Sequence, residues 1–195
     1  MCDHGRAVFY LDKNGECDMS IIRKGTLEDL AQVAEIYHHI LEREEQGLTS
    51  IGWVRGVYPT EETAREALEA GELFVLIQEG VVAAAAKINQ EQVPEYRDAQ
   101  WQYQEAKDEE IMVLHTLVVD PAFAGKGYGS QLVAFYEEYA RKQGCRYLRM
   151  DTNVNNTSAR RLYGHLGYQE VGIVPCTFNG ISDVYLVCLE KLLEE

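Results

Sequence analysis

Three glycines at alternate positions, Gly125, Gly127 and Gly129, follow the mostly apolar run 111–119. That run predicts a buried strand, and the amphipathic stretch after the glycines predicts a helix ending near Gly144. The first N–H groups of a helix lack partners within the helix, and the helix dipole adds partial positive charge beside them. Because glycine lets an anion approach the backbone closely, this turn predicts a phosphate-binding site. The structural alternative is that the glycines serve only helix packing.

The spacing of the glycines excludes two common nucleotide-binding turns. A P-loop requires GxxxxGK[ST], which the sequence does not contain. A dinucleotide-binding turn requires GxGxxG, and Ser130 stands in place of its last glycine. The string GxGxG after VVDP is neither of these, so the turn does not favour a nucleotide-binding protein.

Residues 114–133, LHTLVVDPAFAGKGYGSQLV, resemble the coenzyme A-binding segment of the GNAT superfamily of N-acetyltransferases. In that family a strand ending in V-x-P precedes [QR]-x-x-G-x-[GA] and an amphipathic helix. Gly127 and Gly129 match the glycines of the motif. Ala124 stands where the family usually has Gln or Arg, which predicts weakened rather than abolished binding, and Lys126 can add charge nearby.

A second segment, residues 155–168 (NNTSARRLYGHLGY), resembles the family pattern N-x-x-A-x-x-L-Y-x-x-x-G-[FY]. The matching residues are Asn156, Ala159, Leu162, Tyr163, Gly167 and Tyr168. Two motifs in the family's order, with a predicted helix and strand between them, are more specific than either alone. The close resemblance covers residues 111–170, a predicted coenzyme A-binding core, while the first 110 residues match only in element order.

The resemblance implies acetyl-coenzyme A as co-substrate. Its pyrophosphate would bind backbone N–H groups of the glycine turn, and its pantetheine arm would pair with the preceding strand. The implied cofactor-binding residues are Leu117, Val118, Val119, Ala124, Gly125, Lys126, Gly127, Tyr128, Gly129, Ser130, Asn156 and Ala159. Asn156 has a second role open to it, as the N-cap of the following helix.

The family's reaction is direct attack of a primary amine on the thioester in a ternary complex, which needs an oxyanion donor, a proton acceptor and a proton donor. Tyr163 matches the family's usual proton donor, since a phenol with a pKa of about 10 stays protonated at neutral pH. Packing on the apolar helix face is its alternative role. Candidates for the proton acceptor are His115, Glu109, which shares strand parity with His115, and an ordered water. A buried structural role for His115 and a solvated charge for Glu109 are the alternatives.

The acceptor is not identified by either motif. In the family, acceptor specificity comes from the segment between the first two helices and from loops around the later strands. Aromatic residues in the corresponding segments are Trp53, Tyr58, Trp101 and Phe178. They are candidates to line an acceptor pocket, or else they seal the edge of the core. A non-catalytic acyl-coenzyme A-binding or sensing module on the same fold is the competing interpretation, favoured by Ala124 and opposed by Tyr163.

The charge pattern limits the partners. The net charge of −14 argues against nucleic acid, because phosphate binding needs a basic surface. Residues 120–165 hold seven Lys and Arg against four Asp and Glu, a balance of +3, so the rest of the chain carries −17. This division suits an anionic donor and favours a cationic acceptor, which is either a small-molecule amine or the amine of a peptide or protein. The resemblance is also compatible with a homodimer, although no residue requires one.

Composition predicts a globular cytoplasmic protein. The 195 residues are 46% hydrophobic, and no apolar run approaches the roughly 20 residues of a membrane span. The N-terminus has no uninterrupted apolar region like that of a signal peptide. The five cysteines, Cys2 among them, are scattered without CxxC spacing, which predicts reduced thiols and no metal site.

The element order implies one α+β domain over residues 1–195, with a GNAT-like mixed sheet flanked by about four helices. The sheet is expected to be mostly antiparallel, with a parallel pair splayed at the coenzyme A site. Residues 1–20 are expected to form an N-terminal extension or extra hairpin, with strands at 6–11 and 17–24 around Asn14-Gly15.

The other elements follow from local signals. A Thr26/Asp29 capping box opens a predicted helix that ends near Gly47, and a second helix follows at 60–71. Turns are expected at Glu79-Gly80 and Asn179-Gly180. Residues 89–110 are polar, contain Trp101 and show no clean period.

Overall fold

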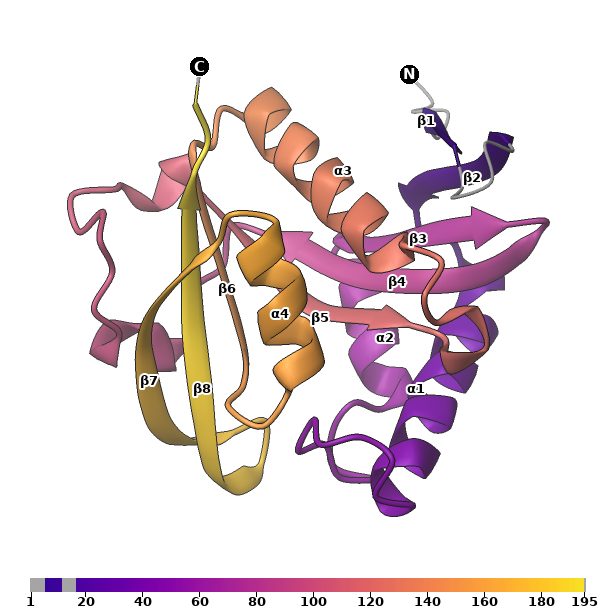
Figure 1. Ribbon diagram of the computed structural model, residues 1–195, viewed down its shortest axis with the longest axis horizontal. Coiled ribbons are helices and arrows are strands. Elements are labelled where there is room, and N and C mark those ends of the chain that lie inside the picture. The colour runs from indigo at the N-terminus through magenta and orange to yellow at the C-terminus, as the bar shows by residue number, and fades with distance from the viewer. Residues whose placement is uncertain (1–5, 12–16, 195) are drawn as a thin grey trace.

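The computed structural model describes residues 6–11 and 17–194, which form one eight-stranded sheet with helices on its faces (Figure 1). The strands are β1 (Arg6–Leu11), β2 (Cys17–Lys24), β3 (Leu73–Gln78), β4 (Val81–Asn89), β5 (Ile111–Val119), β6 (Tyr147–Asn153), β7 (Gln169–Phe178) and β8 (Ile181–Leu192). The α-helices are α1 (Leu30–Glu45), α2 (Glu61–Glu69), α3 (Tyr128–Gln143) and α4 (Thr157–His165). The strand order is β1-β2-β3-β4-β5-β6-β8-β7.

Only the central pair, β5 and β6, is parallel among the described strands, and all other neighbours are antiparallel. The parallel pairing is short: it begins at Ile111↔Tyr147 and ends at Leu114↔Met150. Beyond it, β5 pairs only with β4, and β6 pairs only with β8. The two strands therefore diverge, as Figure 1 shows, and the expected mostly antiparallel sheet with a splayed parallel pair is confirmed.

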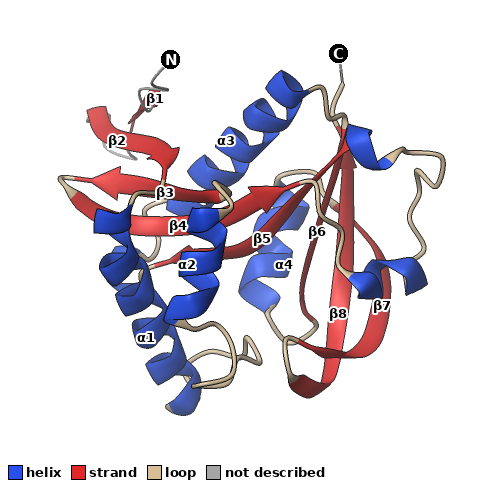
Figure 2. Cartoon of the chain, turned by 180° about the vertical axis from the view of Figure 1, so that it is seen from behind, coloured by secondary structure: helices blue, strands red, loops and turns tan. Residues whose placement is uncertain are grey.

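The two faces of the sheet carry different helices, which Figure 1 and Figure 2 show from opposite sides. Helices α1 and α2 pack on residues such as Val75 and Ala85, whereas α3 and α4 pack on residues such as Leu76 and Ala84. Alternate residues of one strand thus enter different cores. The alanines at 83–86 are fully buried, because helices approach β4 from both sides.

The cap, the turn and the strands predicted from local sequence signals are present in the structure. Thr26 donates to Asp29 through its backbone N–H (2.8 Å) and its hydroxyl (2.9 Å), which caps the turn that leads into α1. The β3–β4 turn places Glu79 and Gly80 at φ 50° and 82°, as a tight hairpin requires. Strands β1 and β2 match the predicted ranges and pair antiparallel. The Asn14-Gly15 turn and Cys2 lie outside the described residues.

The segment 89–110, which had no period in the sequence, covers the face of the sheet opposite α4 (Figure 2). It contains two short 3-10 turns, η2 (Pro94–Asp98) and η3 (Asp108–Glu110). Tyr96 and Trp101 are buried there against β5, β7 and β8. Within the described ranges, no helix has the length and apolar character needed to cross a membrane.

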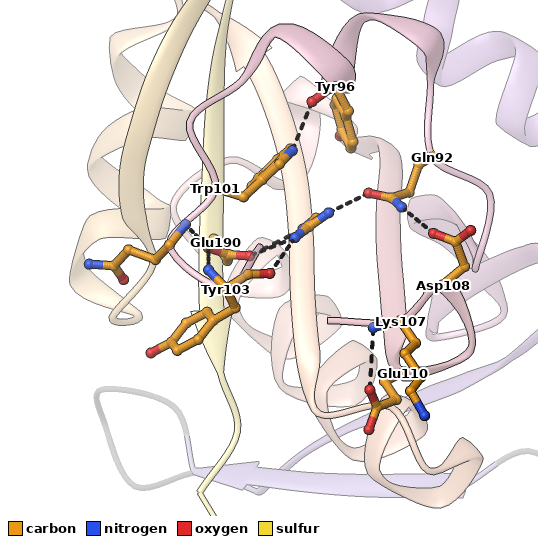
Figure 3. Close-up of polar contacts among 10 residues, drawn as sticks. Gln92, Tyr96, Trp101, Tyr103, Lys107, Asp108, Glu110 and Glu190 are labelled. Atoms are coloured by element: carbon orange, nitrogen blue, oxygen red, sulfur yellow. Dashed lines mark hydrogen bonds and ion pairs between the residues drawn. The ribbon is translucent and has the colours of Figure 1, made fainter. Parts of the chain in front are cut away.

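A buried ion pair fixes this segment to the sheet (Figure 3). The side chains of Arg149 on β6 and Glu190 on β8 are 5% and 0% exposed, and they lie 3.1 Å apart. Glu190 Oε2 also accepts the backbone N–H groups of Gln102 (2.8 Å) and Tyr103 (3.3 Å). Arg149 donates to Gln92 Oε1 (2.6 Å) and to the carbonyl oxygen of Tyr103 (3.1 Å). The pair thus satisfies polar groups from two separate stretches of the segment, at Gln92 and at residues 102–103.

Replacing Glu190 by Gln should lower the free energy of unfolding by about 3 kcal/mol, because it leaves the Arg149 charge buried and uncompensated. Urea unfolding measures this. The control is Glu170→Gln, which removes an exposed ion pair with Arg160 and should cost about 1 kcal/mol or less. Equal losses in the two variants would contradict the role given to the buried pair.

Candidate active site

A cavity of about 1230 Å³ opens where β5 and β6 part. Its walls include residues 114–119 of β5 and 151–153 of β6, which lie at or beyond the end of the parallel pairing. The turn before α3, one face of α4, the loop before α2 and the β7–β8 turn also line it, together with residues from α1, α2, β4, β8 and the start of the segment 89–110. Pockets for a single small ligand are typically about 300–1,000 Å³. This cavity therefore has room for a donor and an acceptor together.

The three glycines of the turn do two different things. Gly125 and Gly127 have φ of 79° and 82°, a region that side chains disfavour, and a Cβ atom at either would meet nothing within 4 Å. Gly129 has an ordinary φ, but a Cβ there would lie 3.1 Å from Leu162 Cδ2. The first two glycines therefore shape an open cradle at the start of α3, and the third allows α3 to approach α4 closely.

The expected cofactor-binding residues gather on this cavity with one exception. The residues that line it are Leu117, Val118, Val119, Ala124, Gly125, Gly127, Tyr128, Gly129, Ser130, Asn156 and Ala159. Lys126 is exposed, and its ammonium group lies 5.2 Å from the centroid of the Phe123 ring. Asn156 Oδ1 accepts the backbone N–H of Ala159 (3.2 Å), so Asn156 caps α4 as well as facing the cavity.

A bulge in β5 directs side chains into the cavity. Between the pairs Lys87↔His115 and Ala85↔Val118, β5 contains one residue more than β4. Thr116 lies in this bulge with φ 48°, a strained conformation for a β-branched residue. Its hydroxyl is hydrogen-bonded to that of Tyr58, which joins the loop before α2 to the bulge.

Tyr163 lies on α4 with its side chain facing the cavity. The residue is 6% exposed, and its ring contacts that of Tyr168 edge to face at 6.1 Å. Burial, assisted by the negative charge of Asp151, raises the pKa of Tyr163 well above that of an ordinary phenol. The hydroxyl therefore holds its proton throughout the neutral range and can donate it within the cavity.

His115 lines the cavity but is held by a polar partner. Its Nε2 lies 2.9 Å from Asn89 Oδ1, which also accepts the N–H of Glu91 (3.1 Å). An amide oxygen only accepts hydrogen bonds, so Nε2 carries the proton of a neutral imidazole. Burial, with the nearby charge of Lys87, lowers the pKa of His115 to about 4. His115 is thus neutral, and a weak base, at physiological pH.

Two sequence expectations are wrong. Glu109 does not share a strand face with His115, because η3 closes residues 108–110 into a turn and β5 begins at Ile111; its side chain is exposed and away from the cavity. Trp101 does not line the cavity. It is buried in the core under the segment 89–110, and its Nε1 donates to the carbonyl oxygen of Tyr96 (2.8 Å).

The other three aromatic candidates, Trp53, Tyr58 and Phe178, do line the cavity. Trp53 and Tyr58 contact each other edge to face, with centroids 5.8 Å apart. The charged lining residues have both signs: Arg43, Glu66, Lys87, Glu91 and Asp151. Across residues 6–11 and 17–194, no group of three or more His, Cys, Asp or Glu side chains is placed to hold a metal ion.

Asp151 is a buried acidic residue of the cavity that the sequence analysis does not identify. It directly follows Met150, the last β6 residue paired with β5, and its Oδ2 accepts the hydroxyl of Tyr96 (2.8 Å). Burial raises the pKa of this carboxyl to about 6, although the Tyr96 hydrogen bond opposes the increase. The available signal was a carboxylate in the predicted strand between the two motifs. Its hydrogen-bond partner, Tyr96, belongs to the segment 89–110, whose position in the fold no sequence pattern predicts.

Comparison with known proteins agrees with this geometry. The sequence model of the acetyltransferase (GNAT) family matches residues 33–168. An uncharacterized N-acetyltransferase of Methanocaldococcus jannaschii is 37% identical over 65 residues, which are 33% of this chain and 29% of that protein. An aminoalkylphosphonate N-acetyltransferase of Salmonella typhimurium is 39% identical over 57 residues, which are 29% of this chain and 37% of that protein. The chain thus matches only about a third of the length of these relatives.

Solved structures share the fold at low sequence identity. A GNAT family acetyltransferase from Streptococcus agalactiae superposes with a TM-score of 0.77 at 20% identity, covering 97% of this chain and all of that one. An acetyltransferase from Salmonella typhimurium, solved with acetyl-CoA, gives a TM-score of 0.65 at 20% identity, covering 90% of this chain and 95% of that one. The splayed sheet, the glycine turn and the extent of the family match lead to one conclusion: the chain belongs to the GNAT acetyltransferase family.

Proposed function

We propose that this protein transfers the acetyl group of acetyl-coenzyme A to a primary amine, by direct attack in a ternary complex. The observation that carries the proposal is that a single cavity joins the glycine turn, the β5 bulge and Tyr163. Donor and acceptor can therefore meet without leaving the protein. The Salmonella structure holds acetyl-CoA on the same fold, which supports this donor.

The residues of the donor half fit an acyl-coenzyme A. The cradle at Gly125 and Gly127 is open, and the start of α3 presents N–H groups and the positive end of a helix dipole to a pyrophosphate. Beyond Leu114, the edge of β5 that faced β6 is free to pair with the extended pantetheine arm. Ala124 lines the cavity without offering a polar side chain, so the backbone carries the binding.

Tyr163 is the proposed proton donor to the leaving sulfur. As the amine attacks, a C–N bond forms, the C–S bond breaks and negative charge moves to sulfur. The surroundings that raise the pKa of Tyr163 also desolvate the sulfur and raise the pKa of its thiol. Proton transfer from the phenol to the sulfur therefore remains feasible inside the cavity, and water returns the proton to Tyr163 afterwards.

The proposed acceptor is a small amine that fits between Trp53, Tyr58 and Phe178. Relatives named for amine acceptors include the aminoalkylphosphonate enzyme and an aminoglycoside N(6')-acetyltransferase of Salmonella typhimurium, 30% identical over 60 residues. The latter match covers 31% of this chain and 41% of that protein. The acidic chain favours amines that carry a second positive charge.

Replacing Tyr163 by Phe should lower kcat by about 10²-fold or more, because a general acid typically contributes that much. The dissociation constant for acetyl-coenzyme A, measured by calorimetry, should stay unchanged. The matched control is Tyr168→Phe, since Tyr168 contacts Tyr163 but donates its hydroxyl to Glu137 (3.1 Å), outside the cavity. An unchanged kcat in Tyr163→Phe would remove this residue from the mechanism.

Replacing Gly127 by Ala should weaken acetyl-coenzyme A binding about tenfold, which corresponds to about 1.4 kcal/mol. The new methyl group would enter the open cradle, and the residue would retain an unfavourable φ of 82°. Gly144→Ala is the matched control, because Gly144 has the same φ and open surroundings at the far end of α3. Similar loss of binding in both variants would show that strain, and not the cradle, was responsible.

Release of free thiol should be fastest with amines that carry a second positive charge, such as polyamines and aminoglycosides, and the preference should weaken as salt is raised. A panel that also contains uncharged and acidic primary amines tests this. A preference for acidic amines would contradict the proposed acceptor class. Stabilisation by acetyl-coenzyme A in thermal unfolding, without thiol release from any amine, would instead favour the non-catalytic acyl-coenzyme A-binding module.

A further inference from the structure

Asp151 stands on the wall of the cavity at the point where the sheet opens. The preceding residue, Met150, still pairs with β5, whereas Asp151 pairs only with Cys188 of β8. Its side chain lies deep in the protein and yet keeps an intermediate exposure, because the space that it faces is the cavity. The carboxylate is therefore available to a bound molecule but shielded from bulk water.

The two oxygens of this carboxylate have different surroundings. Oδ2 accepts the Tyr96 hydroxyl at 2.8 Å, while Oδ1 makes no hydrogen bond within the described part of the chain and is not sealed from the cavity. One oxygen is thus held in place, and the other is left to accept a hydrogen bond or a proton. This arrangement suits an oriented base better than a structural carboxylate, which would have partners on both oxygens.

Tyr96 is itself held by the network that fixes the segment 89–110 (Figure 3). Trp101 donates to the carbonyl oxygen of Tyr96, and the two rings pack edge to face with centroids 5.0 Å apart. The guanidinium of Arg149 lies 4.2 Å from the centroid of the Trp101 ring. Arg149 and Asp151 are alternate residues of β6 and face the same side. The segment therefore binds β6 through Arg149 and orients the carboxylate of Asp151.

We propose that Asp151 accepts the proton of the attacking amine, and that Tyr96 is the positioning residue that holds its carboxylate. The inference rests on the proposed function, since it concerns the same cavity and the same reaction. It replaces the two proton acceptors expected from the sequence. Glu109 lies away from the cavity, and burial lowers the pKa of His115 to about 4, which makes its unprotonated nitrogen a weaker base than the Asp151 carboxylate.

The proton balance of the step is complete without another reactant. The neutral amine attacks the thioester carbon, and the nitrogen becomes positively charged and strongly acidic as the C–N bond forms. Its proton passes to Oδ1 of Asp151 while the C–S bond breaks and Tyr163 gives its proton to sulfur. The products are the amide and free coenzyme A, and exchange with water restores both side chains.

Several groups from the surrounding elements interact electrostatically with Asp151. They are Tyr58 from the loop before α2, Glu95 and Tyr96 from η2, Tyr163 from α4, Cys176 from β7 and Cys188 from β8. All the tyrosine and cysteine groups have raised pKa values, so they stay neutral near pH 6. Compared with these tyrosine and cysteine groups, the carboxyl of Asp151 has a pKa of about 6 and titrates between pH 5 and 7.

The pH dependence of kcat/KM tests the proposal, using the amine that gives the fastest thiol release. In the wild-type protein, kcat/KM calculated for the concentration of neutral amine should rise with pH and level off above about pH 6, as Asp151 loses its proton. Asp151→Asn keeps an oxygen for Tyr96 but should lose about 10²-fold or more in kcat and lack this acidic limb. Tyr96→Phe removes a hydrogen bond that lowers the pKa of Asp151, so its limb should move to higher pH. Asp108→Asn, in the same segment but outside the cavity, is the control and should change nothing.

A second measurement does not depend on catalysis. Because the folded-state pKa is raised above the unfolded value of about 3.9, ionisation of Asp151 destabilises the fold. Asp151→Asn should therefore be more stable than the wild type above about pH 6, and this advantage should disappear as the pH falls towards 4. Asp108→Asn should show no such change.

The outcomes separate the two proposals. An active wild type whose acidic limb persists in Asp151→Asn overturns the role of Asp151 and leaves the proposed function intact. A raised KM with an unchanged kcat also overturns it, since Asp151 would then only bind the acceptor. A wild type that binds acetyl-coenzyme A but releases no thiol with any amine overturns the proposed function, and this inference with it.

Discussion

The early end of the β5–β6 pairing is the constraint on which the rest of the structure depends. After Leu114 and Met150, each strand keeps its antiparallel neighbour and loses its parallel one. Two strand edges are thereby exposed inside the protein, where unpaired backbone groups are costly unless something binds them. The cavity is the space between these two edges. Residues of β4 and β5 line one side of it, and residues of β6 and β8 line the other. An extended ligand that supplies hydrogen bonds to β5 completes a ladder that the chain itself leaves unfinished.

Strand β6 carries a stabilising ion pair and a carboxylate that faces the cavity within three residues of each other. The Arg149–Glu190 pair has nearly every polar atom matched and lies in the closed part of the sheet. Asp151, two residues further along β6, has one oxygen matched and the other facing the cavity. Because burial raises the pKa of Asp151, its ionised form lowers the stability of the fold at neutral pH. Active sites often lower protein stability in this way. The segment 89–110 connects the two, because the same buried residues that anchor it also place Tyr96.

The sequence predicts those features whose signals are local. Helix caps, tight turns and the glycine cradle each depend on a few neighbouring residues, and the two motifs mark the strand–turn–helix and helix that face the cavity. It fails where distant segments meet. Tyr96 and Asp151 are 55 residues apart, and Arg149 and Glu190 are 41 apart, so no periodicity records either contact. Strand parity predicts Glu109 on the same face as His115 only if the strand extends back to residue 109, whereas a 3-10 turn with a hydrogen bond from Glu110 N–H to the Lys107 carbonyl oxygen ends just before Ile111. Trp101 resembled a pocket residue because an aromatic side chain in a polar segment has no local sign of burial.

The contact between Gly129 and Leu162 links the two motifs of the chain physically. A Cβ atom at position 129 would lie 3.1 Å from Leu162 Cδ2, closer than most packed side chains approach, so a side chain at position 129 would require Leu162 to move by a few tenths of an ångström. Leu162 is adjacent to Tyr163, so any repacking at this contact also shifts the helix that carries that hydroxyl. Positions 129 and 162 should therefore covary among related sequences, with a residue larger than glycine at 129 accompanied by a smaller one at 162. Insertions in the intervening loops can change the spacing between the motifs, whereas added volume at this crossing requires Leu162 or its helix to move.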